Sequence, residues 1–375
     1  MKKRGHRVNG KFGRETDAVF QELMGYLRDI PERFHEGERA LGDEQQVLEG
    51  YKWVFSILQV ATDVFLWGDA SKPRFVDIVG PYKKWGGDNT DAFYQYFPVD
   101  PRRSYRIHGV RGDAVYLSLT VYGGPDDGRY SDRIVFTVND RDLDIAPDGS
   151  FSFVMGPKRP EGYDGLFLET AEDAVAAITR DYMNDPDDGR RVSWHVECMD
   201  EADGPWRLTD ADVARRLRAV LTWVKDQSAM VPLALGEPNH IEDPYPVPKV
   251  THGWAAGDAS YAMGSFDLAD DEALVMTGRF PECGFWNVCL WNQFLHTYNA
   301  DYDRTTLNGG QAVSNPDGSI TVVVAATDPG HPNWITPQGH PRGRIWWRWF
   351  QPSETPAPLR VEKVAISDVV DATRA

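Results

Sequence analysis

Side chains suited to proton transfer gather in the C-terminal third of this 375-residue chain. The motif DPGHPNW predicts a rigid turn that projects Asp328, His331 and Asn333 from the end of a strand, with Trp334 as its apolar anchor. Histidines such as His331 and His340 titrate near neutral pH, which suits general acid–base catalysis beside a carboxylate. We therefore predict three catalytic residues, which are Asp328, His340 and His331.

A purely structural interpretation of the same residues stays open. Asp328 and Asn333 are of the types that commonly hydrogen-bond their own loop backbone. A histidine on a loop is often an ordinary surface residue. The histidines and carboxylates also lack the i, i+4 or short alternating spacing of a metal site, so we predict neither a metal nor another cofactor.

Ligand recognition is predicted from two strands rich in aromatic residues. FWNVCLWNQF (285–294) alternates with large aromatics on both faces, as expected for a strand with the core on one side and a groove on the other. In RGRIWWRWF, Arg344 and Arg348 share a face with Trp346, so guanidinium groups stacked on indoles would hold a carboxylate, a sulfate or other polar groups of a ligand in a largely apolar groove. A cation–π ladder without a ligand is the alternative. The predicted substrate-binding residues are Trp286, Asn287, Trp291, Arg304, Asn333, Trp334 and Arg348.

An internal repeat indicates how these strands are held. Three pairs of segments recur in the same order, namely 114–119 with 285–290, 147–150 with 316–319, and 192–197 with 358–362. Chance recurrence of the PDGS hairpin turn would explain one match but not all three. The alignment sets 177–182 opposite 345–350, so we predict a strand at 176–182 although its composition favours a helix. The repeat therefore predicts two related β-domains in tandem.

Helices are predicted where apolar residues recur at three- and four-residue spacing, near 15–36, 43–67 and 210–227. Between the helices, short alternating strands separated by turn clusters are typical of β-sandwiches. The predicted class is mainly β with accessory helices. The predicted domains are an N-terminal helical segment (1–70), a first β-sandwich (71–205), a bridging helix with a proline-rich linker (206–250) and a second β-sandwich (251–375).

The C-terminal motifs FWNVCLWN, YDRTTLNGGQAV, PDGSITVVVAATDPGHPNWITPQGH and GRIWWRWFQP resemble the bacterial domain of unknown function 1214, often paired with domain of unknown function 1254. The resemblance covers roughly residues 255 to 365 and implies jelly-roll-like β-sandwiches accompanied by helices. It supplies no reaction. The positions that match the family pattern are Arg304, Asn308, Asp328, Pro329, Gly330, Asn333, Trp334, Gly339, His340, Gly343 and Arg348.

The amino-acid composition limits the classes of partner that the protein is expected to bind. Forty basic and fifty-seven acidic residues leave a net charge of −17, which disfavours binding to nucleic acids and to anionic lipid surfaces. No apolar run approaches the length of a membrane span, and the three cysteines make no disulfide framework, so a cytoplasmic location is expected. The expected partners are a small-molecule ligand and further copies of the chain in a homo-oligomer.

Three functions of different class remain open on this basis. The first is a metal-independent acid–base enzyme, a lyase, isomerase or hydrolase, acting on a largely apolar substrate in a tryptophan-rich pocket. The second is a carbohydrate-binding or carbohydrate-active protein, which predicts an open cleft with Trp286 or Trp291 exposed. The third is a structural oligomer whose aromatic side chains form subunit contacts.

Overall fold

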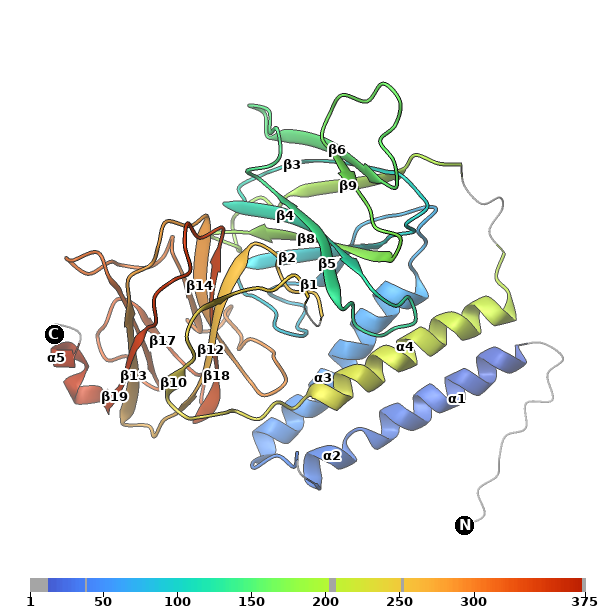
Figure 1. The fold of residues 1–375 in the computed structure, drawn as a ribbon. Helices are drawn as coiled ribbons and strands as arrows, with labels where there is room; N and C mark the ends of the chain where they lie inside the picture. Colours follow the sequence, from blue (N-terminus) through green and yellow to red (C-terminus); the bar gives the residue numbers. More distant parts are fainter. Residues whose placement is uncertain (1–12, 38, 202–206, 251–252, 373–375) are drawn as a thin grey trace, which may run out of the picture.

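The computed structural model describes residues 13–37, 39–201, 207–250 and 253–372. Two β-sandwiches lie side by side, and the long helices lie together beside the first of them (Figure 1). The predicted fold class, mainly β with accessory helices and two tandem sandwiches, is confirmed.

The helices form close to the predicted positions. The N-terminal segment is broken at Pro31, because proline has no N–H to donate and its ring clashes with the preceding turn. The side chains of Asp43 and Thr209 cap the next two long helices by accepting hydrogen bonds from Gln46 N and Asp212 N. The elements are α1 (Arg14–Asp29), α2 (Glu32–His35), α3 (Glu44–Ala61), the π-helix η1 (Thr62–Leu66), α4 (Asp210–Met230), the 3-10 helix η2 (Ile366–Asp368) and α5 (Val369–Ala372).

The first sandwich has a large and a small sheet. The large sheet has the order β1 (Val76–Val79), β2 (Ala92–Pro98), β8 (Ala174–Tyr182), β4 (Tyr116–Gly123) and β5 (Arg133–Asn139). The small sheet has the order β7 (Phe167–Glu169), β6 (Ser150–Gly156), β3 (Tyr105–Val110) and β9 (Ser193–Cys198). The segment 176–182 is a strand as predicted, because β8 is paired on both sides and tertiary pairing outweighs local propensity.

The second sandwich is built in the same way. Its large sheet has the order β10 (His240–Ile241), β12 (Ala259–Asp267), β18 (Arg342–Phe350), β14 (Phe285–Trp291) and β15 (Thr306–Asn308), with β11 (Tyr245–Pro246) also on β12. Its small sheet has the order β17 (Trp334–Ile335), β16 (Ile320–Ala325), β13 (Glu272–Gly278) and β19 (Arg360–Ala365). The proline-rich linker therefore supplies two short strands, β10 and β11, to this sheet.

The two sandwiches repeat one topology. Each strand from β2 to β9 corresponds to the strand numbered ten higher, and the parallel pair β6–β7 recurs as β16–β17. The register agrees as well, since Tyr182 pairs with Ala92 and Tyr116 where Phe350 pairs with Ala259 and Phe285. Tyr116, and not Ala114, is thus equivalent to Phe285, a shift of two residues from the sequence alignment.

Each sandwich has its own core between its sheets, and the helices cover the outer face of the first large sheet. On that face, Tyr96, Tyr122 and Ile178 pack in one cluster with Val60 of α3 and Trp223 of α4. Helices α3 and α4 therefore bury this face of the first large sheet. Within the described residues, no helix has the length and apolar character needed to cross a membrane.

Candidate functional site

The two large sheets meet through equivalent residues of the two repeats. Tyr116 packs against Phe350 with ring centroids 4.9 Å apart, and the equivalent pair, Phe285 with Tyr182, lies 5.0 Å apart. Tyr182 and Phe350, themselves equivalent, are 4.3 Å apart. The contact between the sandwiches, which we call the seam, therefore has approximate two-fold symmetry, like the interface of a symmetric homodimer.

Two buried arginines occupy equivalent positions beside this contact. Arg180 lies two residues before Tyr182 on β8, and Arg348 lies two residues before Phe350 on β18. Both arginines are only 3% exposed. Arg348 pairs across the strands with Tyr261, and the guanidinium of Arg180 lies 5.8 Å from the ring centre of Tyr94.

Both arginines line a cavity of about 230 Å³ between the sandwiches, which we call the seam pocket. Its walls come from both large sheets, from the end of α4 and from loops of both repeats. Most of the lining is aromatic or aliphatic, as is usual in small-molecule sites. The lining side chains other than glycine are Ile78, Val79, Trp85, Tyr94, Tyr130, Ile178, Arg180, Tyr182, Met230, Trp254, Ala255, Tyr261, Leu295, Trp346 and Arg348.

Arg348 has hydrogen-bonding capacity left over. Its Nη2 donates to the carbonyl of Gly87 at 2.9 Å, and its guanidinium carbon lies 4.8 Å from the ring centres of both Trp291 and Trp346. Its Nη1 is buried without a hydrogen-bond partner among the described residues. A buried donor of this kind is costly unless another group fills the gap.

Arg180 is more fully used by the protein. Its Nη1 donates to Thr120 Oγ1 at 3.2 Å, and its Nη2 donates to Tyr122 Oη at 2.8 Å and to the Trp254 carbonyl at 2.6 Å. This arginine thus ties the first sheet to the loop before β12.

Three tyrosines lie near both guanidinium groups. Tyr94, Tyr182 and Tyr261 each interact electrostatically with Arg180 and with Arg348. Burial raises the pKa of Tyr94 to about 12 and that of Tyr182 further still, so both hydroxyls are neutral at neutral pH. The Tyr94 and Tyr182 hydroxyls share a hydrogen bond of 2.8 Å. The pocket therefore offers positive charge and neutral hydroxyl groups.

A buried polar network joins the sandwiches next to the pocket. Asn287 Nδ2 donates to Asn89 Oδ1 and to Asp91 Oδ2, each at 2.7 Å, and Asn308 Nδ2 donates to Asp91 Oδ1 at 3.0 Å. Burial raises the pKa of Asp91 to about 6, although the two amide donors oppose this shift. Asn287, a predicted substrate-binding residue, therefore has its amide engaged within the protein.

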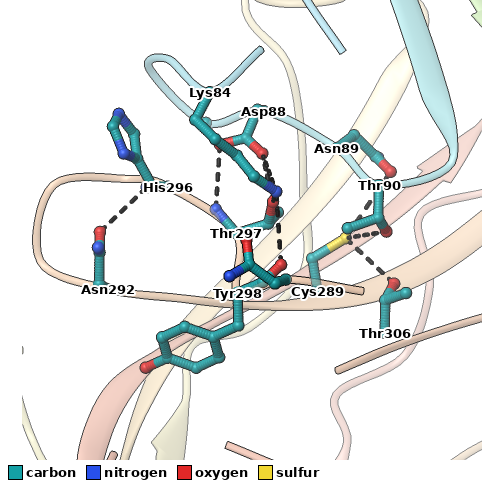
Figure 2. A network of polar contacts seen from close by, with 12 residues as sticks. Lys84, Asp88, Asn89, Thr90, Cys289, Asn292, His296, Thr297, Tyr298 and Thr306 are labelled. Carbon is teal, nitrogen blue, oxygen red and sulfur yellow. Dashed lines mark hydrogen bonds and ion pairs between the residues drawn. The ribbon is translucent and has the colours of Figure 1, made fainter. Parts of the chain in front are cut away.

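The loop before β2 docks on the loop after β14 through a second part of this network (Figure 2). Lys84 and Asp88 both contact Thr297, and Lys84 Nζ lies 3.6 Å from Asp88 Oδ2. Close to these residues, the Cys289 thiol contacts the hydroxyls of Thr90 in the first repeat and Thr306 in the second. Burial raises the pKa of the Cys289 thiol, which is the property of an unreactive, structural cysteine.

The turn predicted to carry catalytic groups is held by its own hydrogen bonds. Asp328 is exposed and accepts from Gly330 N at 2.7 Å, and His331 Nδ1 accepts from Asn333 N at 3.1 Å. Asn333 is buried and its amide bonds the backbone of residues 313 and 321. Trp334 Nε1 donates to the Ala325 carbonyl. All these contacts correspond to the structural interpretation.

His340 lies elsewhere, where α3 meets the second sandwich. Its Nε2 is 2.8 Å from Glu49 Oε1, its Nδ1 is 2.8 Å from the Pro337 carbonyl, and its ring stacks on Tyr298. Burial by itself lowers the pKa of His340, but the hydrogen bond and charge of Glu49 outweigh it, so the pKa is raised. The structure therefore gives Asp328, His340 and Arg348 separate sets of partners.

The remaining predicted binding residues divide between core and surface. Trp286 stacks on Trp347 in the core of the second sandwich, and Trp291 is fully buried beneath Arg348. Arg304 is exposed and donates to the Pro332 carbonyl. Of the ten predicted residues, only Arg348 lines the seam pocket. The Trp291 ring lies directly against the Arg348 guanidinium.

Several pocket residues were missed by the sequence reasoning, chiefly Arg180, Tyr94 and Tyr261. A signal for Arg180 was present, because the alignment of 177–182 with 345–350 sets it opposite Arg348. Arg180 lies between Thr179 and Asp181 and has no tryptophan beside it along the strand, so it lacked the feature that singled out Arg348.

Comparison with known proteins is consistent with this repeat. The family model described as protein of unknown function (DUF1214) matches residues 91–186 and 265–354, so the resemblance noted for the C-terminal half extends to the first half. A crystal structure of an uncharacterised protein from Burkholderia cenocepacia is similar, with a TM-score of 0.80 and 26% identity over 94% of this chain and 98% of that one.

A Vibrio parahaemolyticus protein structure aligns over 83% of this chain and 98% of its own, at 12% identity and a TM-score of 0.48. A search of curated proteins finds no match. The chain thus contains two tandem regions of the DUF1214 family, one in each sandwich.

Proposed function

We propose that this protein binds a small, largely apolar molecule in the seam pocket. The observation that supports the proposal most is the buried Nη1 of Arg348, which faces no hydrogen-bond partner in the part of the chain that the structure describes. Buried donors are usually paired. Several buried indole N–H groups of the described residues also lack a partner, but Arg348 is the charged residue with such a donor that lines the pocket, and a ligand atom would satisfy it. The volume of about 230 Å³ suits a ligand smaller than a typical drug.

The open hollow lined by Asp91, Asp301, Asp303 and Arg304 is larger, at about 500 Å³, yet it supports a site less well. Asp91 is buried there, and its carboxylate already accepts hydrogen bonds from Asn287 and Asn308. The seam pocket combines aromatic walls with an arginine donor that lacks a partner among the described residues.

The predicted acid–base enzyme and the carbohydrate protein receive less support from this pocket. No carboxylate or imidazole is found among the described residues that line it, so tyrosine hydroxyls are its proton-transfer groups. The carbohydrate interpretation expects Trp286 or Trp291 in an open cleft, whereas Trp291 is fully buried and the half-buried Trp286 stacks on Trp347. Binding, and not proton transfer by His340 or His331, is therefore the function we propose.

Native mass spectrometry of the purified protein tests the proposal. We expect the wild-type chain to carry an additional small mass that is lost on denaturation. Ala255→Leu should lose this mass, because Ala255 lines the pocket and the larger side chain would occupy it. Ala269→Leu adds the same volume at an exposed turn and should keep the mass.

Two results would contradict the proposed binding of a ligand in the seam pocket. A wild-type chain with no bound mass, which also fails to bind any of the three naphthalene probes described below, would overturn the proposal. Equal occupancy in wild-type protein and Ala255→Leu would place the ligand outside the seam pocket.

A further inference from the structure

We infer that the ligand of the seam pocket carries one anionic group, which Arg348 binds, on an otherwise apolar body. The inference rests on the proposed function and names the class of ligand. It follows from the charges around the pocket, from the different use of the two equivalent arginines and from the distribution of apolar side chains.

The charge around the pocket is positive and incompletely balanced. Arg180 and Arg348 form no ion pair with a carboxylate anywhere in the described ranges. Two buried carboxylates interact electrostatically with Arg348, and burial raises the pKa of both. Asp88 pairs with Lys84 and accepts from Thr297, and Asp91 accepts from Asn287 and Asn308. Arginine stays charged at any physiological pH, and a buried unpaired charge is destabilising. An anionic ligand group supplies the missing partner.

The two arginines differ in how many of their terminal nitrogens donate a hydrogen bond to the protein. Arg180 uses both terminal nitrogens on Thr120, Tyr122 and the Trp254 carbonyl. Arg348 uses only Nη2, and its Nη1 has no acceptor among the described residues. One free arginine end therefore predicts one anionic group, although the repeat places two arginines at equivalent positions.

The lining assigns an orientation to the ligand. Arg348, Trp346 and Tyr261 come from the second sandwich, and the Trp346 indole N–H also lacks an acceptor in the described structure. Apolar side chains from β1, β8 and α4 line the pocket from the first sandwich and its helix, namely Ile78, Val79, Ile178 and Met230. The anionic group thus points to β18 and the apolar body to the first sandwich.

Calorimetric titration with matched probes tests this inference on the full-length protein. The probes are 2-naphthoate, 2-naphthalenesulfonate and the neutral 2-naphthamide, which share one ring system. We expect at least one of the two anions to bind tenfold or more tightly than the amide, because charge-assisted hydrogen bonds to a buried arginine are the stronger ones. Which anion binds better distinguishes a carboxylate ligand from a sulfonate-like one.

Two arginine variants locate the charge preference. Arg348→Gln should weaken binding of the preferred anion at least tenfold and leave the amide within about threefold, so that the preference disappears. Arg344→Gln removes a charge from the same face of β18, but Arg344 does not line the pocket and donates to the Ala234 carbonyl. It should leave both affinities unchanged. Arg348→Lys keeps the charge without the planar fork and should be intermediate.

The outcomes separate the two proposals. Equal or tighter binding of 2-naphthamide by wild-type protein would overturn the anionic ligand and leave the binding pocket standing. Failure of all three probes to bind, together with the absence of a co-purifying mass, would overturn both. The wild-type comparison stands even if Arg348→Gln does not fold, and loss of anion binding in Ala255→Leu would show that the probe occupies the seam pocket.

Discussion

Arg348 and Asn287 sit opposite each other on paired strands, yet their side chains have different roles. Asn287 is fully buried, and its amide joins Asn89 and Asp91 of the first repeat to the second. Arg348 lines the pocket, and one of its buried donors has no partner among the described residues. At the scale of single residues, hydrogen-bond saturation distinguishes a structural polar group from one available to a ligand.

Asn287→Ala should lower the free energy of unfolding by roughly 2 to 3 kcal/mol, because it leaves the buried Asp91 with one amide donor fewer. Urea unfolding measures this loss. Asn315→Ala is a matched control, since its amide donates to Ser319 and Thr321 within one sandwich at a part-buried position, and it should lose about 1 kcal/mol. Equal losses in the two variants would show that the seam network has no special weight.

Residue types alone predicted the contact of Arg348 with tryptophan, which is observed, while its role in binding a ligand stays a prediction. They did not separate it from Asp328, Asn333 and Trp334, whose hydrogen bonds close within their own loop and strands. Structural polar residues and residues available to a ligand are of the same types and occur at similar spacing in the sequence. Only their partners, set by folding, tell them apart.

At the scale of elements, α3 is attached to the second sandwich by a buried charged contact. His340 approaches Glu49 of α3, and Phe294, just after β14, packs on Trp53 of the same helix. The predicted strand 285–294 ends at Trp291, because Asn292 accepts from the backbone of Phe294 and His296 and turns the chain. That turn places Phe294 against the helix.

The contact between His340 and Glu49 should depend on pH. The folded protein holds the His340 proton more tightly than the unfolded chain does, since its pKa is raised above the ordinary 6.5. The stabilisation is therefore fully present below pH 6.5 and is lost as pH rises through the folded-state value. Relative to His340→Gln, the wild type should be more stable by roughly 1 to 2 kcal/mol at pH 6, and this margin should shrink by pH 9.

Urea unfolding at the two pH values measures the margin. His35→Gln serves as the control, because His35 is exposed on α2, and it should show no such change between the two conditions. A margin for His340→Gln that is the same at pH 6 and pH 9 would contradict the assigned role of the ion pair.

At the scale of the whole molecule, two repeats face each other as two subunits of a symmetric dimer would. The repeats have diverged at the centre of this contact, where Tyr182 of the first corresponds to Phe350 of the second and Ile178 corresponds to Trp346. Divergence gives the pocket two different ends, which a pair of identical subunits could not provide.

We further propose that the chain forms a homo-oligomer through the exposed face of α3. Leu48, Tyr51 and Phe55 are 58%, 44% and 72% exposed and lie at i, i+3 and i+7 on this helix. Exposed apolar side chains grouped in this way mark protein contacts. Light scattering coupled to gel filtration should give a multiple of 42.3 kDa for the wild type.

The double variant Leu48→Glu, Phe55→Glu should give the mass of a single chain, since charge on both positions disfavours burial. Thr327→Glu, at an exposed loop of the second sandwich, should leave the wild-type mass unchanged. A wild-type protein that elutes as a monomer would remove the oligomer from consideration.

By itself, the sequence determined the helices, the alternating strands and their duplication, because apolar periodicity and turn residues act over short distances along the chain. Tertiary structure decided which faces of the repeats meet, and therefore where the pocket lies. Arg180 and Arg348 are 168 positions apart, and Tyr94 and Tyr261 are similarly distant. Only the packing of two sheets brings such residues to one cavity, since burial and hydrogen-bond partners are properties of the folded chain.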